Sequence, residues 1–316
     1  MIMASTSTNT EVPQTSAGNP FTLSDESAYA KWRQMKLERR PRSAEDLVVP
    51  ITELGALSAV EHNELTRLCR NANLAIYECL QPVEKHAVRK LGRQLGLIHM
   101  DNNLCADDDS ISSVEVRSEK LQAGYIPYTK RKLNWHTDGY YNPPGQRVQA
   151  FILHCVRDAA SGGVNEFMDP EIAYILIRDK KPDYIRALMH PLAMTIPANQ
   201  HGDSVLRQAQ TGPVFFVDPK SGSLNMRYTA RTRSIQWRQD TLTLNAASCL
   251  AEILSSESPS YRLRYRLRSG QGVICNNVLH CRSSFLDHPP RTRLLYRARY
   301  YDRIDNTGMQ NVMNEN

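Results

Sequence analysis

Apolar positions follow helical spacing in the first third of the chain. Residues 58–80, "SAVEHNELTRLCRNANLAIYECL", and residues 82–97, "PVEKHAVRKLGRQLGL", carry apolar side chains every three or four positions, which predicts two helices. Ser58 is the expected N-cap of the first helix. Pro82 is expected to open the second helix, and a glycine to close it.

After Cys105 the pattern changes to short β-branched or aromatic runs bounded by Gly, Pro and Asn. The predicted strands cover residues 112–119, 147–158, 213–218, 261–268, 272–277 and 293–301. Helical spacing returns in three insertions, at residues 170–179, 182–190 and 241–257. Helices first, then many strands with helical insertions, predict an α+β fold with a β-sandwich or barrel core.

The two ends of the chain have a different composition from its middle. Residues 1–22 are rich in Ser, Thr and Pro and have few apolar side chains, so we expect a disordered N-terminal tail. Residues 306–316 are expected to be a flexible C-terminal tail for the same reason. Neither a linker nor an internal repeat interrupts residues 23–305, which predicts a single domain.

The composition is that of an ordinary soluble protein, with 41% hydrophobic and 23% charged residues. The apolar runs are too short to cross a bilayer, and the first residues do not resemble a secretory signal. The seven cysteines lack CxxC spacing, and Cys155, Cys249 and Cys275 lie in apolar stretches. We therefore expect reduced thiols and a cytoplasmic protein without a membrane partner.

The net charge is 39 − 33 = +6, and the arginines concentrate in residues 227–238, 261–270 and 291–303. They alternate there with apolar residues at a period of two, as in strands with one polar face. That face is either solvated or the lining of an anion-binding interior, and neither reading favours a nucleic-acid partner. Within the first stretch, Arg227 and Tyr228 are expected on an exposed strand rather than in a pocket.

The stretch "NWHTDGYYNPPG", residues 134–145, carries the chemistry. His136 and Asp138 are two positions apart, so on a strand both can reach one metal ion. Among the other histidines, His280 stands out because it follows the predicted strand 272–277, where a polar loop begins. We expect His62 and His86 on the surface and His154 in the core.

Two histidines and one carboxylate suit a non-haem Fe(II) oxygenase, and zinc is the competing metal. The HExxH motif of many zinc hydrolases is absent.

Four motifs in order, "WHTD", "SGGVNEF", "LHCRSSF" and "RTRLLYRARYY", resemble the taurine dioxygenase family of Fe(II)/2-oxoglutarate-dependent oxygenases. The resemblance extends from about residue 90 to residue 301, and the two histidines are 280 − 136 = 144 residues apart, as is typical of that family. It implies a double-stranded β-helix, or jelly roll, with flanking helices. It also implies an iron ion held by His136, Asp138 and His280 as the catalytic centre.

The resemblance further implies that 2-oxoglutarate chelates the iron and that an arginine takes its far carboxylate. The best register assigns this role to Arg293, with Arg291 as the alternative. Asn165 stands where the family often has a threonine that contacts the same carboxylate, and its amide can also donate. The implied reaction consumes O2, releases succinate and CO2, and is stimulated in such enzymes by ascorbate.

The substrate side of the resemblance departs from taurine. Arg297 matches the family arginine that grips an anionic head group, whereas Asp101 and Lys132 replace other taurine contacts. We therefore expect a small anionic or zwitterionic substrate and poor turnover of taurine. The alternative is a metal- or ligand-binding sensor without turnover on the same fold. The sequence is also compatible with a homo-oligomer.

Overall fold

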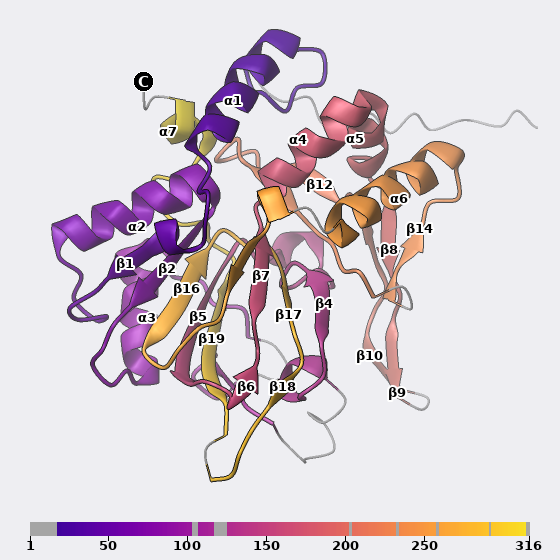
Figure 1. Ribbon diagram of the computed structural model, residues 1–316. Helices are drawn as coiled ribbons and strands as arrows, with labels where there is room; N and C mark the ends of the chain where they lie inside the picture. Colours follow the sequence, from indigo (N-terminus) through magenta and orange to yellow (C-terminus); the bar gives the residue numbers. More distant parts are fainter. Residues whose placement is uncertain are drawn as a thin grey trace, which may run out of the picture.

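The computed structural model describes residues 18–102, 107–116, 125–201, 204–231, 234–256, 259–290 and 292–313 (Figure 1). Its largest sheet has six strands in the order β1–β2–β16–β5–β19–β3. Neighbours in it are antiparallel except for β1 and β2, which are parallel. The strands are β1 (Val48–Pro50), β2 (Leu74–Glu78), β16 (Gln271–Cys275), β5 (Ala150–Arg157), β19 (Leu294–Tyr300) and β3 (Ser112–Val114).

A second, fully antiparallel sheet has the order β15–β7–β17–β4. Its strands are β15 (Leu263–Tyr265), β7 (Asn165–Met168), β17 (Leu279–Arg282) and β4 (Leu133–His136). The chain passes from this sheet to the larger one between β4 and β5, and in the opposite direction between β16 and β17.

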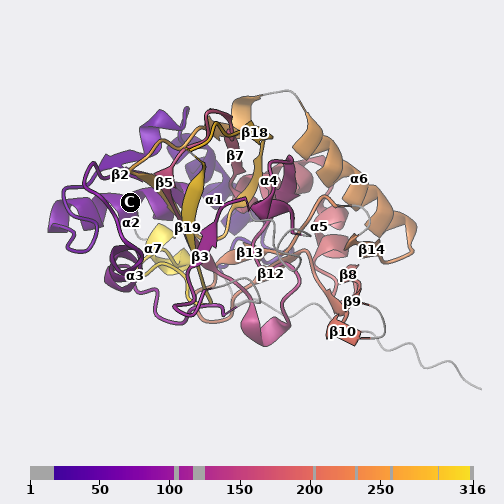
Figure 2. The same cartoon turned by 90° about the horizontal axis from the view of Figure 1, so that it is seen from below.

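Short strands complete the β structure. One three-stranded sheet and three pairs are formed by β11 (Gln210–Gly212), β8 (Met194–Ile196), β14 (Gln236–Trp237), β10 (Ser204–Arg207), β9 (Asn199–His201), β12 (Phe215–Val217), β13 (Leu224–Met226), β18 (Phe285–Leu286) and β6 (Ser161–Gly162). Two views place the β9–β10 pair at the periphery, on the side away from α2 (Ala59–Ala72) (Figures 1 and 2).

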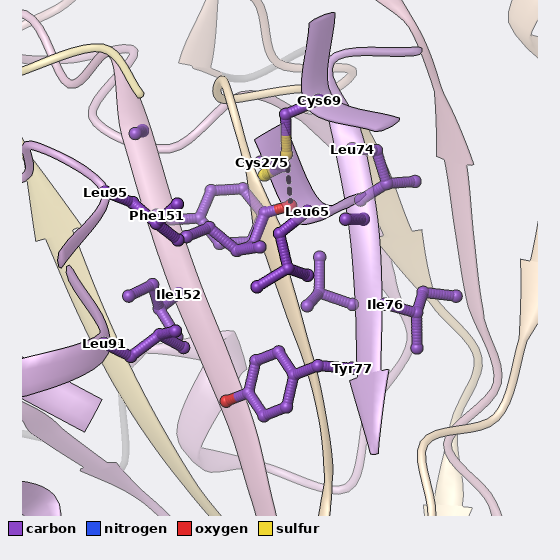
Figure 3. Packing of buried hydrophobic residues seen from close by; sticks show 14 of the residues in the cluster. Leu65, Cys69, Leu74, Ile76, Tyr77, Leu91, Leu95, Phe151, Ile152 and Cys275 are labelled. Atoms are coloured by element: carbon purple, nitrogen blue, oxygen red, sulfur yellow. Dashed lines mark hydrogen bonds between the residues drawn. The ribbon is translucent and has the colours of Figure 1, made fainter. Parts of the chain in front are cut away.

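Two groups of helices cover the sheets and enclose two apolar cores. The helices are α1 (Glu26–Arg39), α2, α3 (Lys85–Gln94), α4 (Pro170–Lys180), α5 (Pro182–Leu188), α6 (Thr241–Ser255) and α7 (Met309–Met313). Leu65 and Leu91, from α2 and α3, pack against Ile76 and Ile152 of the larger sheet (Figure 3). The second core lies among α1, α4, α5 and α6. This combination of helices and sheets confirms the predicted α+β class.

The first predicted helix begins as expected. Ser58 caps α2 through a capping box, in which its hydroxyl accepts from the Glu61 N–H and the Glu61 carboxylate accepts from the Ser58 N–H. The prediction of helix as far as residue 80 was wrong, however, because α2 ends at Ala72 and Asn73 adopts a left-handed conformation with φ 56°. The following residues form β2, which lies between β1 and β16 and buries four of its five side chains. Pairing with β16, almost 200 residues later in the chain, makes this segment a strand instead of the end of a helix.

The second helix is shorter than predicted. Glu84 is the N-cap of α3, so Pro82 precedes the helix instead of opening it. Gly96, with φ +79°, follows the C-cap residue Leu95, as expected of a terminating glycine. The three later helical insertions and the predicted strands that lie in the described residues all contain the corresponding elements.

Both expected tails have packed residues near the domain. The predicted N-terminal tail lies outside the described residues up to residue 17, but Phe21 is 1% exposed and packs edge-on against Trp32 and Tyr174. At the other end, Met309 and Val312 of α7 are buried in the second core. Phe21 at one end of the chain and Met309 and Val312 at the other thus pack against the domain although their neighbours in the sequence are mostly polar.

Six of the seven cysteines lie in the described residues, and all six are buried and outside any disulfide. They include Cys155, Cys249 and Cys275, as predicted. None of the described helices combines the length and apolar character needed to cross a membrane.

Phe21 tests the packing of the segment that the sequence assigns to a tail. We expect Phe21→Ala to lower the free energy of unfolding by about 3–5 kcal/mol, because it leaves a cavity between Trp32 and Tyr174. Val60→Ala is the control, since Val60 is 78% exposed. Urea denaturation measures both, and an equal, small change in the two variants would contradict the packing of Phe21.

Candidate metal centre

Antiparallel pairing brings together the three side chains predicted to hold a metal. β17 pairs with β4 in a register that sets His280 opposite His136, and the two ring centroids are 4.2 Å apart. Asp138 follows two residues after His136, with 3.6 Å between the His136 Nε2 and Asp138 Oδ1 atoms. One ligand atom from each residue lies within 4.8 Å of the other two. The predicted cluster therefore exists in the fold.

Both histidines are oriented by main-chain carbonyls. His136 Nδ1 lies 2.9 Å from the Asn134 carbonyl oxygen, and His280 Nδ1 lies 2.9 Å from the Val278 carbonyl oxygen. Such a contact requires the proton on Nδ1, which leaves the Nε2 lone pair for a metal. Burial, reinforced by the neighbouring His136, lowers the pKa of His280 to about 3, so this imidazole is neutral. A neutral imidazole is the form that binds metal.

Asp138 is a buried carboxylate that stays ionised. Burial by itself raises its pKa, but the charge of Arg297 and the contact with His136 outweigh burial and hold the pKa well below its usual range. Asp138 Oδ2 is buried and makes no hydrogen bond to the described residues. An unsatisfied carboxylate oxygen beside two imidazoles that turn their Nδ1 atoms to carbonyls fits a divalent cation.

Arg293 and Asn165 line one small cavity, together with Gly162, Gly163 and Leu295. Arg293 directly precedes β19 and is 6% exposed, with its guanidinium 5.0 Å from the centre of the Phe285 ring. Burial, followed by the charge of Arg282, lowers the pKa of Arg293 to about 9. Within the described chain its guanidinium makes no ion pair. A buried cation of this kind is stabilised when an anion enters the cavity.

Asn165 reaches this cavity from β7, the neighbour of β17. Asn165 pairs with Arg282, and Phe167 pairs with His280. Alternate residues of a strand share a face, so Asn165 and His280 lie on the same face of the smaller sheet. Arg291, the alternative to Arg293, lies outside the described residues.

Arg297 lies beside the metal cluster. Its Nη1 is 3.7 Å from Asp138 Oδ1, and its Nε is buried without a hydrogen bond to the described residues. Arg299, two positions further along β19, forms an ion pair with Asp101 and donates to the Tyr141 hydroxyl at 3.0 Å. Sequence reasoning missed Arg299, although it continues the period-two series that contains Arg293 and Arg297.

Asp101 is not the free pocket carboxylate that the sequence suggested. Besides its ion pair with Arg299, it accepts hydrogen bonds from the Tyr301 hydroxyl at 2.8 Å and the Asn142 amide at 3.2 Å. Its charge is therefore used to neutralise Arg299. The expectation that Asp101 attracts a substrate ammonium group is corrected on this ground.

Lys132 is exposed on the segment before β4. Its charge acts on Cys281, whose thiol has its pKa raised to about 12 by burial, with Glu166 next in effect. Since Cys281 and His280 are adjacent in a strand, their side chains point to opposite faces of the sheet. Lys132 is thus exposed, and its charge acts on a side chain of the face opposite to His280.

Two expectations about other residues had different outcomes. Arg227 and Tyr228 are buried, contrary to the expected exposed strand, and Arg227 donates to main-chain carbonyls, including that of Gly212 at 2.9 Å. The Tyr228 carbonyl accepts from the Thr137 N–H at 3.0 Å, and the Tyr228 N–H donates to the Thr137 hydroxyl at 3.1 Å, between the two ligands of the His-x-Asp motif. His154 is a buried core histidine, as expected, with its Nδ1 3.2 Å from the Tyr77 hydroxyl.

Known proteins are similar in sequence to parts of this chain. A uridine-5'-phosphate dioxygenase from Amycolatopsis sp is 32% identical over 170 residues, which are 52% of this chain and 60% of that protein. Human gamma-butyrobetaine dioxygenase is 31% identical over 84 residues, 26% of this chain and 19% of its own length. This chain thus spans less than two thirds of the length of these relatives.

Solved structures share the fold. An asparagine oxygenase in complex with Fe(II), 2S,3S-3-hydroxyasparagine and succinate superposes with a TM-score of 0.57 at 15% identity, covering 78% of this chain and 81% of that one. A putative alpha-ketoglutarate-dependent taurine dioxygenase from Burkholderia xenovorans gives a TM-score of 0.56 at 12% identity, covering 82% and 87%. At these identities the likeness concerns the fold alone.

The family match covers most of the chain. Residues 37–299 match the family described as taurine catabolism dioxygenase TauD, TfdA family. The matched region includes β4, β17 and most of β19, and with them every residue of the metal cluster. This chain belongs to the TauD, TfdA family of dioxygenases.

Proposed function

We propose that this protein is an Fe(II)- and 2-oxoglutarate-dependent dioxygenase that oxidises a small anionic substrate. The observation that carries the proposal is the buried cluster of His136, Asp138 and His280, with both Nδ1 atoms turned to carbonyls and one carboxylate oxygen unsatisfied. Membership in the TauD, TfdA family supports the same reaction class.

The donor set favours iron over zinc. Two imidazoles and one carboxylate on one side of an ion leave positions open for a co-substrate, as non-haem Fe(II) oxygenases require. A zinc hydrolase would have no use for the buried cation Arg293 in a cavity on the neighbouring strands. When bound, Fe(II) supplies the redox chemistry that couples decarboxylation of 2-oxoglutarate by O2, giving succinate and CO2, to oxidation of the substrate.

The protein's part in co-substrate binding falls to Arg293 and Asn165. A planar guanidinium takes a carboxylate through two parallel hydrogen bonds, and the cavity excludes most of the water that would compete. The Asn165 amide can donate a third bond to the same carboxylate. The far end of 2-oxoglutarate would thereby be fixed while its keto acid faces the metal ligands.

The two large sheets support a double-stranded β-helix as the core. Its eight inner strands would be β16, β5, β19 and β3 facing β15, β7, β17 and β4, with the connections β4–β5 and β16–β17 crossing between sheets. In this arrangement the metal ligands and Arg293 project into the space between the sheets, and α2 and α3 flank the outside.

The substrate is proposed to carry a negative charge. The Nε atom of Arg297 is buried beside the cluster and makes no hydrogen bond to the described residues, whereas Asp101 is neutralised by Arg299 and no longer offers a partner to an ammonium group. An anion is therefore favoured over a zwitterion. Since a relative is named for uridine 5'-phosphate, this phosphate ester belongs in the first panel of substrates, beside carboxylates and sulfonates.

The metal ligands are tested by substitution. We expect His136→Ala, Asp138→Ala and His280→Ala each to abolish Fe(II)-dependent formation of succinate, because two remaining ligands hold a labile ferrous ion too weakly. His86→Ala is the matched control, since its side chain is 65% exposed. Normal turnover by His280→Ala would refute the assignment. Binding of metal and 2-oxoglutarate without any succinate would favour the sensor alternative.

Steady-state kinetics can test the proposed binding of the far carboxylate of 2-oxoglutarate by Arg293. Arg293→Ala should raise the KM for 2-oxoglutarate by roughly two to three decades, since an unpaired carboxylate left in a buried site costs about 3–5 kcal/mol. Arg264→Ala is the control, because the Arg264 side chain is 69% exposed. If Arg291→Ala shows the effect and Arg293→Ala does not, the anchor is Arg291. No effect from either would argue against 2-oxoglutarate.

The substrate contact is separable from the co-substrate contact. With a substrate found in the panel, Arg297→Leu should raise the substrate KM more than the KM for 2-oxoglutarate, because the proposed contact with the anionic head group is lost while Arg293 still binds 2-oxoglutarate. Substrate-stimulated succinate formation measures both constants at saturating Fe(II). Efficient oxidation of taurine, or equal changes in the two constants, would show that Arg297 does not select the substrate.

A further inference from the structure

The turn between β16 and β17 contains a residue that holds the metal-binding loop directly. Asn277 lies three residues before His280, is 6% exposed and has φ 47°, in the left-handed region. Asparagine tolerates this conformation better than most residues. Its side chain crosses to the segment that contains Asp138, almost 140 residues earlier in the chain.

Three hydrogen bonds connect the Asn277 amide to that segment. Its Oδ1 accepts from the Asp138 N–H at 2.8 Å, and its Nδ2 donates to the Asp138 carbonyl at 3.0 Å and to the Val148 carbonyl at 2.7 Å. The amide thus satisfies both main-chain groups of Asp138 and also holds the segment that leads into β5. All three bonds are buried.

This contact has a geometric consequence for the metal cluster. Strand β4 ends at His136, so the main chain of Asp138 is outside the β17–β4 ladder. Asn277 takes the place of that ladder, and it belongs to the same turn that delivers His280. Asn277 therefore ties the main chain of Asp138, which lies beyond the paired strands, to the turn that precedes His280.

We propose that Asn277 is a positioning residue that sets the affinity for the metal by fixing Asp138 relative to His280. The inference rests on the proposed metal site, since it explains how that site is assembled. Residues that do not bind the metal but orient its ligands typically raise the affinity for the metal by about 10–100-fold. Asn277 orients a ligand through its main chain instead of its side chain.

The adjacent residue provides a matched control. Asn276 is 4% exposed and also makes three side-chain hydrogen bonds, to Asn73, to Thr307 and from the Ile304 N–H. These bonds tie the turn to residues 73, 304 and 307, and none of them is made with a residue of the metal cluster. Loss of either amide removes a similar set of buried bonds, but only Asn277 touches Asp138.

Co(II) binding to the apo protein, followed by calorimetry and by the cobalt absorption bands, tests the inference without turnover. We expect Asn277→Ala and Asn277→Gly to weaken binding by roughly 10–100-fold. Glycine tolerates the left-handed backbone and lacks the side-chain amide, so Asn277→Gly separates the contribution of the amide from that of the backbone conformation. Asn276→Ala should lower the melting temperature to a similar extent and bind Co(II) as the unsubstituted protein does.

The outcomes are distinguishable. Normal binding by Asn277→Gly, or equal weakening by Asn276→Ala, would overturn the role of the amide. If the Asn277 variants do not fold, hydrogen exchange of the Asp138 amide in the apo protein decides: slow exchange supports the contact, and exchange at the rate of an open loop overturns it. Failure of the unsubstituted protein to bind Co(II), as His280→Ala should fail, would instead overturn the proposed function.

Discussion

The position of β17 between β7 and β4 is the constraint on which the metal centre depends. One register sets His280 opposite both His136 and Phe167, so a shift by a single residue would turn His280 to the other face of the sheet. His136 and His280 come from segments 144 residues apart, and only strand pairing brings them together. The main-chain carbonyls of Asn134 and Val278, which orient the two rings, belong to the same strands or to the turn beside them.

Charges in the interior follow from the same architecture. Arg293, directly before β19, and Arg297 and Arg299 within it have largely buried side chains, where each cation needs a counter-charge. Arg299 has Asp101, and Arg297 lies 3.7 Å from Asp138. The Arg293 guanidinium lies over the Phe285 ring and forms no ion pair within the described residues, since the nearby Asp287 carboxylate accepts from the Arg293 main-chain N–H. Two of the three are thus compensated within the described protein, and the third is suited to an anionic ligand. The cavity lined by Arg293 and Asn165 is thus distinguished by its uncompensated positive charge rather than by its shape.

Sequence reasoning succeeded where the signal was local or belonged to a family pattern. The N-cap at Ser58, the strands around Cys155 and Cys275, and the convergence of His136, Asp138 and His280 could all be predicted. Sequence reasoning failed where the conformation of a segment depends on pairing with a segment far away in the sequence. Residues 74–78 form a strand because β16 pairs with them.

The same reason explains the errors in the site. Asp101 looks like a free carboxylate until Arg299, almost 200 residues later, is placed beside it. Asn277 carries no signal in one sequence, because an asparagine in a turn is ordinary. Phe21 and Met309 were assigned to tails because each is a lone apolar residue among polar neighbours, yet both contribute to a core made by other segments.

The order of strands has a consequence for the growing polypeptide. β5 pairs with β16 on one edge and with β19 on the other, so both of its partners are synthesised late. β16 begins 271 − 157 = 114 residues after β5 ends. At ribosomal speeds of roughly 5–20 residues per second, the apolar segment "AFILHCVR" remains without either partner for on the order of ten seconds. An apolar strand with two unpaired edges can pair with strands of other chains and aggregate, and chaperones prevent this by binding it. Chaperone binding to β5 during synthesis would therefore determine the yield of folded protein.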